Sequence, residues 1–541
     1  MKKLFFTFFI IFLSCFLLSA QRQKNNMTLE DVNNLDKFER AFTAILNLYV
    51  NETNNSQIIE DAIKGMLEKL DPHSAYTNAE DTRKMNEPLE ANFDGIGIHF
   101  NMLLDTLYIV QVFPGGPSEK VGLMPGDRIV RVDDTLIAGV KMSNNDIIKL
   151  IRGKKGTSVN IKVKRGDDPN LLEFLIIRDN LPVNSIDATY MADAQTGYIR
   201  LSRFAASSFK EFQYSLSKLQ DQGMKNLILD LQENGGGYLH IGYILANQFL
   251  EKGKLIVYMQ GDKLGRQDIL STDDGIFTEG KLVILVNESS ASASEILAGA
   301  IQDWDRGVIV GRRSFGKGLI QRAIEFPDSS MIRLTVARYC TPSGRNIQRP
   351  YEKGNLEAYR HDLVDRFNKG ELINADSIHF PDSLKFSTLI SKRTVYGGGG
   401  IMPDYFVPID TSRNTEYHYS LNRYGLINRC SMSYLDQNRK ELLQKYPNID
   451  VFKATFTVHE GLLQRLLALA EETKIEFKEE QYNKSKDYIS LQLKAYIARD
   501  LFDVSAYFQI INDRNDSYLQ ALQIINDDPY YNQLLSGNSS R

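Results

Sequence analysis

The sequence predicts an α/β protein of several domains, with a core of mixed sheet and helix and helical regions at both ends. Its 541 residues are enough for three or four domains of roughly 100–200 residues each. Strand-like apolar runs alternate with amphipathic helical runs between residues 180 and 410, which is typical of layered α/β folds. The hydrophobic content of 43% and the charged content of 24% are ordinary for globular proteins, so large cores are expected.

The first twenty residues have the layout of an export signal. Two lysines precede an almost unbroken apolar run, Leu4 to Ser19, which is slightly short for a membrane span. Cleavage after Ala20 and retention as an N-terminal membrane anchor both stay open, because Leu18 is bulky for the position before a cleavage site. A lipid anchor on Cys15 is a further alternative. We therefore expect an exported protein of the periplasm or cell envelope.

Composition narrows the classes of ligand. A net charge of −4 and a pI near 6.1 give no electrostatic case for nucleic acid as a partner. The seven histidines include no H-E-x-x-H motif, so neither a metal site nor a cofactor is predicted. A disulfide between Cys340 and Cys430 is permitted in an oxidising compartment, but nothing in the sequence argues for it.

Four regions follow the predicted signal at residues 1–20. Each is recognised by its pattern of apolar residues and turns. They are a helical region at 28–85 with two helices joined by the loop "NETNNSQ", a small β-rich module at 88–168, the α/β core at 180–410, and a helical region at 411–541.

The core region contains four buried-strand candidates and two clear helices. The strands are apolar runs of five to eight residues, and the helices repeat apolar residues at three and four. The predicted strands are 197–204, 226–231, 282–287 and 307–311, and the predicted helices are 207–223 and 292–304.

The stretch "GRRSFGKGLIQ" fits two incompatible functions. Gly311 to Lys317 match the G-x-x-x-x-G-K opening of a phosphate-binding loop. Such a loop needs Ser or Thr after its lysine and then a helix, whereas Gly318 and the strand-like "LIQRAIEF" follow here. Because both the hydroxyl residue and the helix are missing, an NTPase is excluded, and Lys317 remains a candidate catalytic base.

A base needs a nucleophile, and "NESSASASEILAGA" at 287–300 offers four serines where a strand turns into a helix. Helix N-terminal amides at such a junction could stabilise an oxyanion. Ser292 and Glu295 also fit a capping box, so a purely structural role stays open. Likewise, the glycines of "DLQENGGGYLH" at 230–240 either admit a ligand to the backbone or only form a tight turn.

Together with "RYCTPSGRNIQ" and "GGGGIMPD" at 397–404, these stretches resemble the C-terminal processing peptidases, the tail-specific serine proteases of peptidase family S41. The resemblance covers about residues 30–410. It implies a protease core of the S41 type with a Ser–Lys dyad and no cofactor. The residues that it assigns are Ser292 as nucleophile, Lys317 as base, Gln321 as the group that orients the base, and the amides of Ala293 and of Gly236 or Gly237 as oxyanion donors.

The β-rich module resembles a PDZ domain. In "FDGIGIHF" the amides near Gly95, Ile96 and Gly97 would bind a substrate's terminal carboxylate, and the strand from Ile98 would pair with the peptide. Arg152 of "IRGKKGT" would couple this module to the protease core. The implied partners are proteins with free, apolar C-termini, while an adaptor or activating protein and the oligomeric state stay open.

Some residues differ from the family pattern, and some motifs fit other functions. Gln232 and Gly235 stand where the family usually has arginine and proline. The insertion at 351–395 and the region after 411 have no functional interpretation. A Ser–His pair that uses His240 lacks an orienting group, and the S-x-x-K matches within 207–218 lack their companion motifs. A non-catalytic PDZ-bearing envelope scaffold on a degenerate protease fold is the main alternative.

Lys317 and Gln321 impose a geometric condition. On a regular strand they would lie about 13 Å apart. The sequence therefore predicts a bend or bulge between them.

Overall fold

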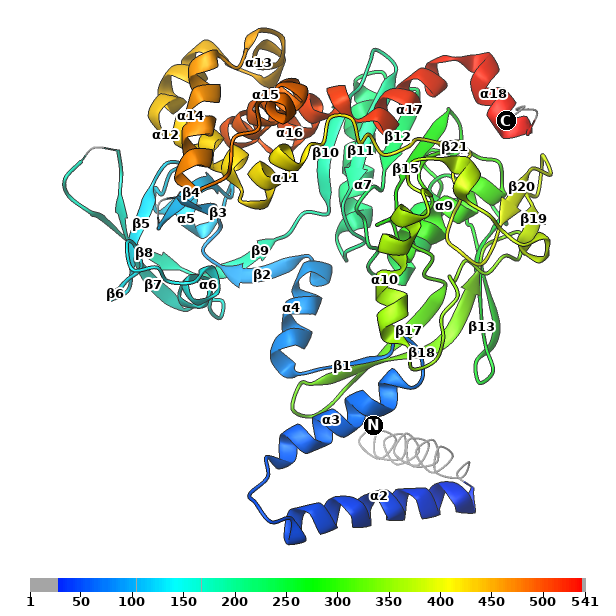
Figure 1. Ribbon diagram of the computed structural model, residues 1–541. Helices are drawn as coiled ribbons and strands as arrows, with labels where there is room; N and C mark the ends of the chain where they lie inside the picture. Colours follow the sequence, from blue (N-terminus) through cyan, green and yellow to red (C-terminus); the bar gives the residue numbers. More distant parts are fainter. Residues whose placement is uncertain (1–27, 104, 167, 538–541) are drawn as a thin grey trace, which may run out of the picture. The chain divides into compact units, whose positions relative to one another are not determined.

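The computed structural model describes residues 28–103, 105–166 and 168–537 (Figure 1). The predicted signal and the alternatives for Ala20 and Cys15 lie outside the described residues. Within those three stretches, no helix has both the length and the apolar character needed to cross a membrane. The chain divides into two compact units, Met1–Leu70 and Asp71–Arg541.

The first unit contains the two predicted helices, α2 (Leu29–Leu48) and α3 (Asn55–Glu68). Helix α3 begins inside the stretch predicted as a loop, because the Asn54 side chain caps it by accepting a hydrogen bond from the Gln57 amide at 3.2 Å. None of the side chains of α2 is buried within the described structure.

The second unit opens with β1 (Ala75–Thr77) and α4 (Ala79–Glu90), which the sequence patterns did not indicate. The predicted β-rich module follows, but it extends beyond residue 168, because β8 completes its main sheet and β9 pairs with β2. Its main sheet has the order β3-β4-β5-β7-β8, β6 pairs with β5, and β2 pairs with β9. Its elements are β2 (Asn92–Gly95), β3 (Ile98–Leu103), β4 (Thr106–Val112), α5 (Pro117–Lys120), β5 (Arg128–Val132), β6 (Thr135–Leu136), α6 (Asn144–Ile151), β7 (Ser158–Lys164), β8 (Leu172–Ile177) and β9 (Asp179–Pro182).

The predicted α/β core is built on a sheet with the order β10-β11-β12-β15-β16-β21. From β11 to β21 the neighbouring strands run parallel, and β10 is antiparallel to β11. Parallel strands buried on both faces read as continuous apolar runs, which is why the sequence revealed β11, β12, β15 and β16, but not the two-residue β21. The strands are β10 (Ile186–Met191), β11 (Thr196–Leu201), β12 (Asn226–Asp230), β15 (Leu282–Val286), β16 (Val308–Gly311) and β21 (Tyr405–Phe406).

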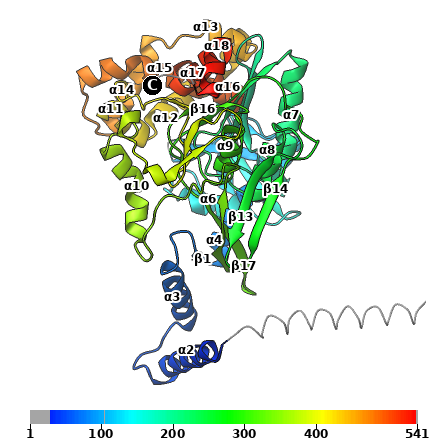
Figure 2. The same ribbon diagram turned by 90° about the vertical axis from the view of Figure 1, so that its right-hand side faces the viewer.

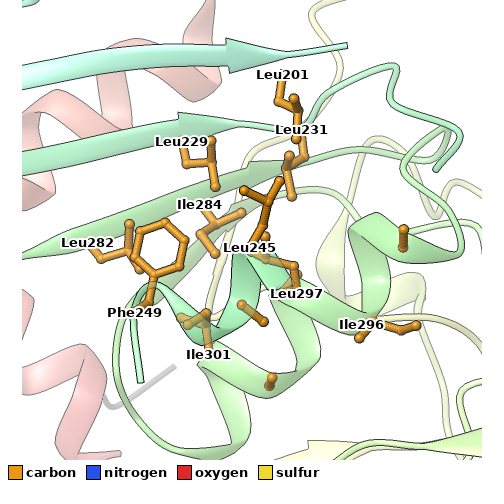
Figure 3. Packing of buried hydrophobic residues seen from close by; sticks show 14 of the residues in the cluster. Leu201, Leu229, Leu231, Leu245, Phe249, Leu282, Ile284, Ile296, Leu297 and Ile301 are labelled. Carbon is orange, nitrogen blue, oxygen red and sulfur yellow. The ribbon is translucent and has the colours of Figure 1, made fainter. Parts of the chain in front are cut away.

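One face of this sheet packs against α7 (Ser208–Asp221), α8 (Leu239–Asn247) and α9 (Ala293–Asp303). Figure 3 shows Leu229 and Ile284 of the sheet pointing toward Leu245 and Leu297 of the helices. This packing fixes α9, and with it the loop between β15 and α9.

The other face of the sheet is covered by the end of the chain. Helix α17 (Asp516–Asn526) contributes Ile524 and Ile525, and α18 (Asp528–Ser536) contributes Leu534, to a cluster with Val283 and Leu285 of β15 (Figure 1). The last helices therefore complete the hydrophobic core of the α/β layer.

A second sheet carries the segment that follows Lys317. Its order is β1-β18-β13-β14, and β17 pairs with β18. Figure 2 labels β1, β13, β14 and β17 of this sheet. Its further strands are β13 (Leu255–Gly261), β14 (Gly265–Leu270), β17 (Leu319–Glu325) and β18 (Met331–Cys340), and the insertion after it forms α10 (Leu356–Asn368), η1 (Ala375–Ser377), η2 (Asp382–Leu384), β19 (Lys385–Ser387) and β20 (Thr394–Tyr396).

The region after 411 is helical, as predicted, and has a hydrophobic core of its own. Met432 packs against Tyr108 and Val110 of the β-rich module, and Asp436 forms an ion pair with Arg128. Its elements before α17 are α11 (Glu416–Arg423), α12 (Leu426–Lys445), α13 (Ile449–Thr455), α14 (Glu460–Glu472), α15 (Glu479–Leu501), α16 (Val504–Ile511) and η3 (Asn512–Arg514). Cys340 and Cys430 are free thiols.

Candidate active site

Ser292 lies at a sharp turn between β15 and α9. Its backbone has φ 57° and ψ −112°, a conformation that costs a non-glycine residue about 1–3 kcal/mol and that is concentrated at functional sites. The turn places Ser292 at the N-terminus of α9, where free amides and the helix dipole favour negative charge.

The structure separates Ser292 from its neighbouring serines. The hydroxyl of Ser290 donates to the Leu231 carbonyl at 2.7 Å, and that of Ser294 donates to the Asn234 carbonyl at 2.9 Å. Both side chains are fully buried and tie the helix turn to the glycine loop. Ser292 is partly exposed, so it is the serine of this group that combines a strained backbone with access to a ligand.

The glycine loop lies directly against Ser292. A Cβ atom on Gly236 would come within 2.8 Å of the Ser292 Cβ and 3.1 Å of the Ala293 nitrogen, so a side chain there would collide with the turn. Gly236 also has φ +98°, which favours glycine. Asn234, which the sequence patterns did not single out, fixes the loop by accepting from the Gly236 amide at 2.9 Å and donating to the Leu201 carbonyl at 2.8 Å.

The two predicted glycines differ in what their amides do. The Gly236 amide donates to the Asn234 side chain. Around Gly237, the loop pairs with Phe204 through the Gly236 carbonyl and the Tyr238 amide, at 2.9 and 2.8 Å. This pairing does not use the Gly237 amide.

Glu295 joins the turn at Ser292 to the loop that carries Lys317. One carboxylate oxygen accepts from the amides of Ser292 and Lys317, both at 2.9 Å. The other accepts from the Gly316 amide at 2.7 Å and the Ser314 hydroxyl at 2.5 Å. Burial raises the pKa of Glu295, and these hydrogen bonds oppose the rise. The capping pattern in the sequence pointed to Glu295, but only as a partner of Ser292.

Tyr339 provides a second link between these two segments. Its buried hydroxyl lies 3.2 Å from the carbonyl oxygen of Ser292 and 2.5 Å from that of Lys317. Glu295 and Tyr339 therefore hold the backbone of both residues from two directions.

Lys317 is set in surroundings that favour a neutral amine. Burial lowers its pKa, the positive charge of Arg333 lowers it further, and Glu295 and Asp71 oppose the shift. The lysine precedes β17 rather than opening a helix, which confirms the exclusion of a phosphate-binding loop.

The irregularity beside Gln321 lies in the partner strand β18 and not in the segment from Lys317 to Gln321, where the sequence predicts a bend or bulge. The register of β17 against β18 shifts between Ile320 and Gln321, because Val336 is an extra residue in β18. The Gln321 side-chain amide donates to the Thr335 hydroxyl at 3.3 Å, and this hydroxyl donates to Asp71 at 3.0 Å. Asp71 lies between α3 and β1, and the sequence patterns predicted no role for it or for Thr335.

The insertion at 351–395 reaches the surroundings of Lys317 through Tyr359 of α10. The Tyr359 hydroxyl lies 2.8 Å from the His73 ring nitrogen Nε2 and accepts from the Gln348 side chain at 3.2 Å. Gln348 in turn accepts from the Gly318 amide at 2.9 Å. Burial, followed by the charge of Lys317, lowers the pKa of His73 to about 4.

The predicted carboxylate-binding segment lines a large cavity. Gly95, Ile96 and Gly97 connect β2 to β3, and Gly97 has φ +82°. The cavity, of about 1300 Å³, has Ile98 of β3 on one side and Ile148 and Ile151 of α6 opposite. It extends to β10, α7 and the start of α16, so three regions of the second unit share its wall.

Arg152 stands at the end of α6, on the rim of the same cavity. Its guanidinium donates to Glu87 of α4 at 2.5 Å and lies 4.9 Å from the centre of the Phe93 ring. The arginine thus connects the β-rich module to α4. His240, the partner in the rival Ser–His arrangement, is an exposed residue of α8. Among the described residues, no group of three or more His, Cys, Asp or Glu side chains is arranged to hold a metal ion.

Comparisons with known proteins identify the regions of the chain. Family models match peptidase family S41 at residues 195–354 and a PDZ domain at 95–176. The N-terminal domain of the activating protease CtpB matches residues 16–81, and a family of unknown function matches 417–503.

Two curated relatives match over most of their length. The carboxy-terminal processing protease CtpA of Bacillus subtilis is 33% identical over 345 residues, 64% of this chain and 72% of that protein. The carboxy-terminal-processing protease of Bartonella bacilliformis is 34% identical over 354 residues, 64% and 80% of the two chains. Among solved structures, the photosystem II D1 C-terminal processing protease is 30% identical, covers 57% of this chain and 89% of its own, and has a TM-score of 0.33.

The sequence match and the α/β architecture with its β-rich module define a serine-type peptidase that carries a PDZ domain. More narrowly, the chain belongs to the carboxy-terminal processing proteases of peptidase family S41.

Proposed function

We propose that this protein is an endopeptidase that cleaves proteins near their C-termini by an acyl-enzyme mechanism with a Ser292–Lys317 dyad. The observation that carries the proposal is the joint placement of the two residues. Ser292 stands strained at a helix N-terminus, and Glu295 binds its amide and that of Lys317 with the same oxygen.

In the first step, the Ser292 Oγ attacks the scissile carbonyl carbon while the neutral Lys317 amine takes the hydroxyl proton. A serine hydroxyl is a weak nucleophile, and only an uncharged amine has a lone pair to accept its proton. The lowered pKa of Lys317 supplies that form at a lower pH than an ordinary lysine would. Gln321 positions the amine without adding charge, since its amide nitrogen is engaged by Thr335 and its oxygen can accept from Lys317.

The tetrahedral intermediate carries a negative oxygen, for which we propose the amides of Ala293 and Gly237 as donors. Gly237 is preferred to Gly236 because the Gly236 amide is already bonded to Asn234. The C–N bond then breaks, and the Lys317 ammonium returns its proton to the leaving amine. Water hydrolyses the acyl-enzyme by the same proton route.

The PDZ domain is proposed to select the substrate. A terminal carboxylate would bind at Gly95, Ile96 and Gly97, and the peptide would extend along β3 from Ile98. The cavity side chains Ile98, Ile148 and Ile151 favour apolar residues at the substrate's C-terminus. Arg152, bonded to Glu87, would link occupation of this groove to α4.

The test uses the protein without its first twenty residues and an unfolded protein with an apolar C-terminus. We expect wild-type cleavage, with Ser292→Ala and Lys317→Met each at least about 10³-fold slower, as expected when one member of a catalytic unit is lost. Amidating the substrate's C-terminus should raise KM. If the wild type cleaves no better than Ser292→Ala across substrates, the Ser292 mechanism is wrong, and absence of cleavage by both would make the chain a PDZ-bearing scaffold instead.

We further propose that the protein acts in the periplasm or cell envelope, on the basis of its N-terminal apolar run. Fractionation of cells that express the full chain checks this proposal. Recovery of the protein in the cytoplasm alone would contradict it.

A further inference from the structure

The C-terminal helices contact the back of the glycine loop through Asn515, which lies between η3 and α17. Its side-chain amide donates to the Gln232 side-chain oxygen at 3.1 Å, across 283 positions of sequence. The same amide donates to Asn512, whose own side chain donates to Tyr190 of β10 at 2.8 Å. Gln232 is the residue that stands where the family usually has arginine.

Gln232 is also held from the core sheet. Its amide donates to Asp230 at 2.8 Å, and its carbonyl accepts from Arg200 at 3.0 Å. Arg200 forms a buried ion pair with Asp230 at 2.6 Å, and the Phe508 ring of α16 lies 4.6 Å from its guanidinium. The C-terminal helices thus contact Gln232 through Asn515 and Arg200 through Phe508.

A surface pocket of about 310 Å³ lies behind the loop, lined by Gln232 and Glu233 on the loop side and by Asn512 and Asn515 on the helical side. At Gln232 the helices contact the loop through the directional hydrogen bond from Asn515. On its other side, the loop leads within four residues to Gly236, which lies against Ser292, and then to Gly237.

We propose that Asn515 and Gln232 form a positioning pair, through which the C-terminal helices hold the glycine loop in register with Ser292. The inference rests on the proposed function, because it treats the loop as an oxyanion donor. A displaced amide weakens binding of the developing negative charge more than binding of the neutral substrate. Loss of the pair therefore acts on kcat and leaves KM nearly unchanged.

The variants are Asn515→Ser and Gln232→Met. Asn515 also caps α17 by accepting from the Tyr518 amide at 3.3 Å, and serine preserves a capping hydroxyl. Asn526→Ser is the matched control, since it removes a 2.8 Å hydrogen bond from the other end of the same helix to Asp193, away from the loop.

We expect each variant of the pair to lower kcat about fivefold, because it loses one hydrogen bond. The KM of each variant should stay within about twofold of the wild-type KM. The double variant should lose little more than either single one, because the two changes break the same contact. Amide hydrogen exchange at residues 234–238 should be faster in Asn515→Ser than in the wild type or in Asn526→Ser.

The inference is overturned if Asn515→Ser matches Asn526→Ser in both kcat and exchange, or if the losses of the two variants multiply. Failure of the proposed function gives a different result, in which Ser292→Ala and the wild type are equal. In that case the exchange measurement still decides whether the pair holds the loop.

Discussion

Lys317 shows how one side chain's surroundings set its chemistry. As an ordinary lysine it would be an ammonium at neutral pH, with no lone pair for the Ser292 proton. Burial and the nearby Arg333 charge both disfavour the ammonium form. The reactive form is therefore created by neighbours, one of which is itself a cation.

This electrostatic effect predicts the pH dependence of cleavage. The neutral amine is the active form, so kcat/KM should rise with pH through a pKa below the ordinary lysine value of 10.5. Replacing Arg333 with Met removes a positive charge and so raises the pKa of Lys317. The rising limb should then move to higher pH, with lower activity at neutral pH and recovery at high pH.

A pH–rate profile checks this expectation. Arg322→Met is the matched control, because Arg322 is an exposed residue of β17 in the same hairpin. If the rising part of the pH–rate profile of Arg333→Met stays in place or moves to lower pH, the assignment of Lys317 as the base is contradicted.

At the scale of elements, the site is a junction between two segments that separate sheets carry. The β15–α9 turn belongs to the core sheet, and the loop before β17 belongs to the second sheet. Glu295 bonds to backbone amides of both, at 2.7–2.9 Å. The alignment of the two segments therefore depends on this buried carboxylate together with the Tyr339 hydroxyl.

Glu295→Gln tests that dependence. A carboxamide replaces one accepting oxygen by an NH₂ group, which would face amide donors, and hydrogen bonds to charged groups are worth about 1.5–3 kcal/mol each. We expect a lower Tm and a fall in kcat/KM of at least about tenfold. Glu325→Gln, an exposed position on β17, should change neither. Wild-type kcat/KM in Glu295→Gln would show that the carboxylate does not align the two segments.

At the scale of the whole molecule, the helices after residue 411 complete the core of the enzyme and contact its glycine loop. Helices α17 and α18 cover one face of the core sheet, α12 packs on the PDZ domain through Met432, and Asn515 reaches the glycine loop. One helical region therefore contacts both the PDZ domain and the glycine loop of the second unit.

Helix α17 offers a direct measure of this contribution to stability. Ile524 is fully buried against the sheet, whereas Leu519 on the same helix is 39% exposed. Ile524→Ala should lower the free energy of unfolding by about 2–5 kcal/mol through lost burial and the cavity left behind. Leu519→Ala should change it by no more than about 0.5 kcal/mol. Denaturant unfolding checks both, and equal effects would mean that α17 does not stabilise the sheet.

The fold could be predicted wherever a local pattern was strong. The strands at 226–231, 282–287 and 307–311 were visible because burial on both faces gives continuous apolar runs, and the helices of the core gave clear periodicity. The pattern missed β1 and α4. Strand β1 has only three residues, and α4 contains Pro88, which weakens a helical pattern.

What the sequence by itself determined was the pair of chemical groups, because Ser292 and Lys317 lie in contiguous motifs whose residue order indicates a serine peptidase of this family. The tertiary structure decided what surrounds them. Asp71, Thr335 and Gln321 form one hydrogen-bonded chain, and Asn515 joins Gln232 across 283 positions. A hydrogen bond between segments so far apart produces no periodicity or spacing in the sequence, since it exists only once the sheets and the C-terminal helices have packed.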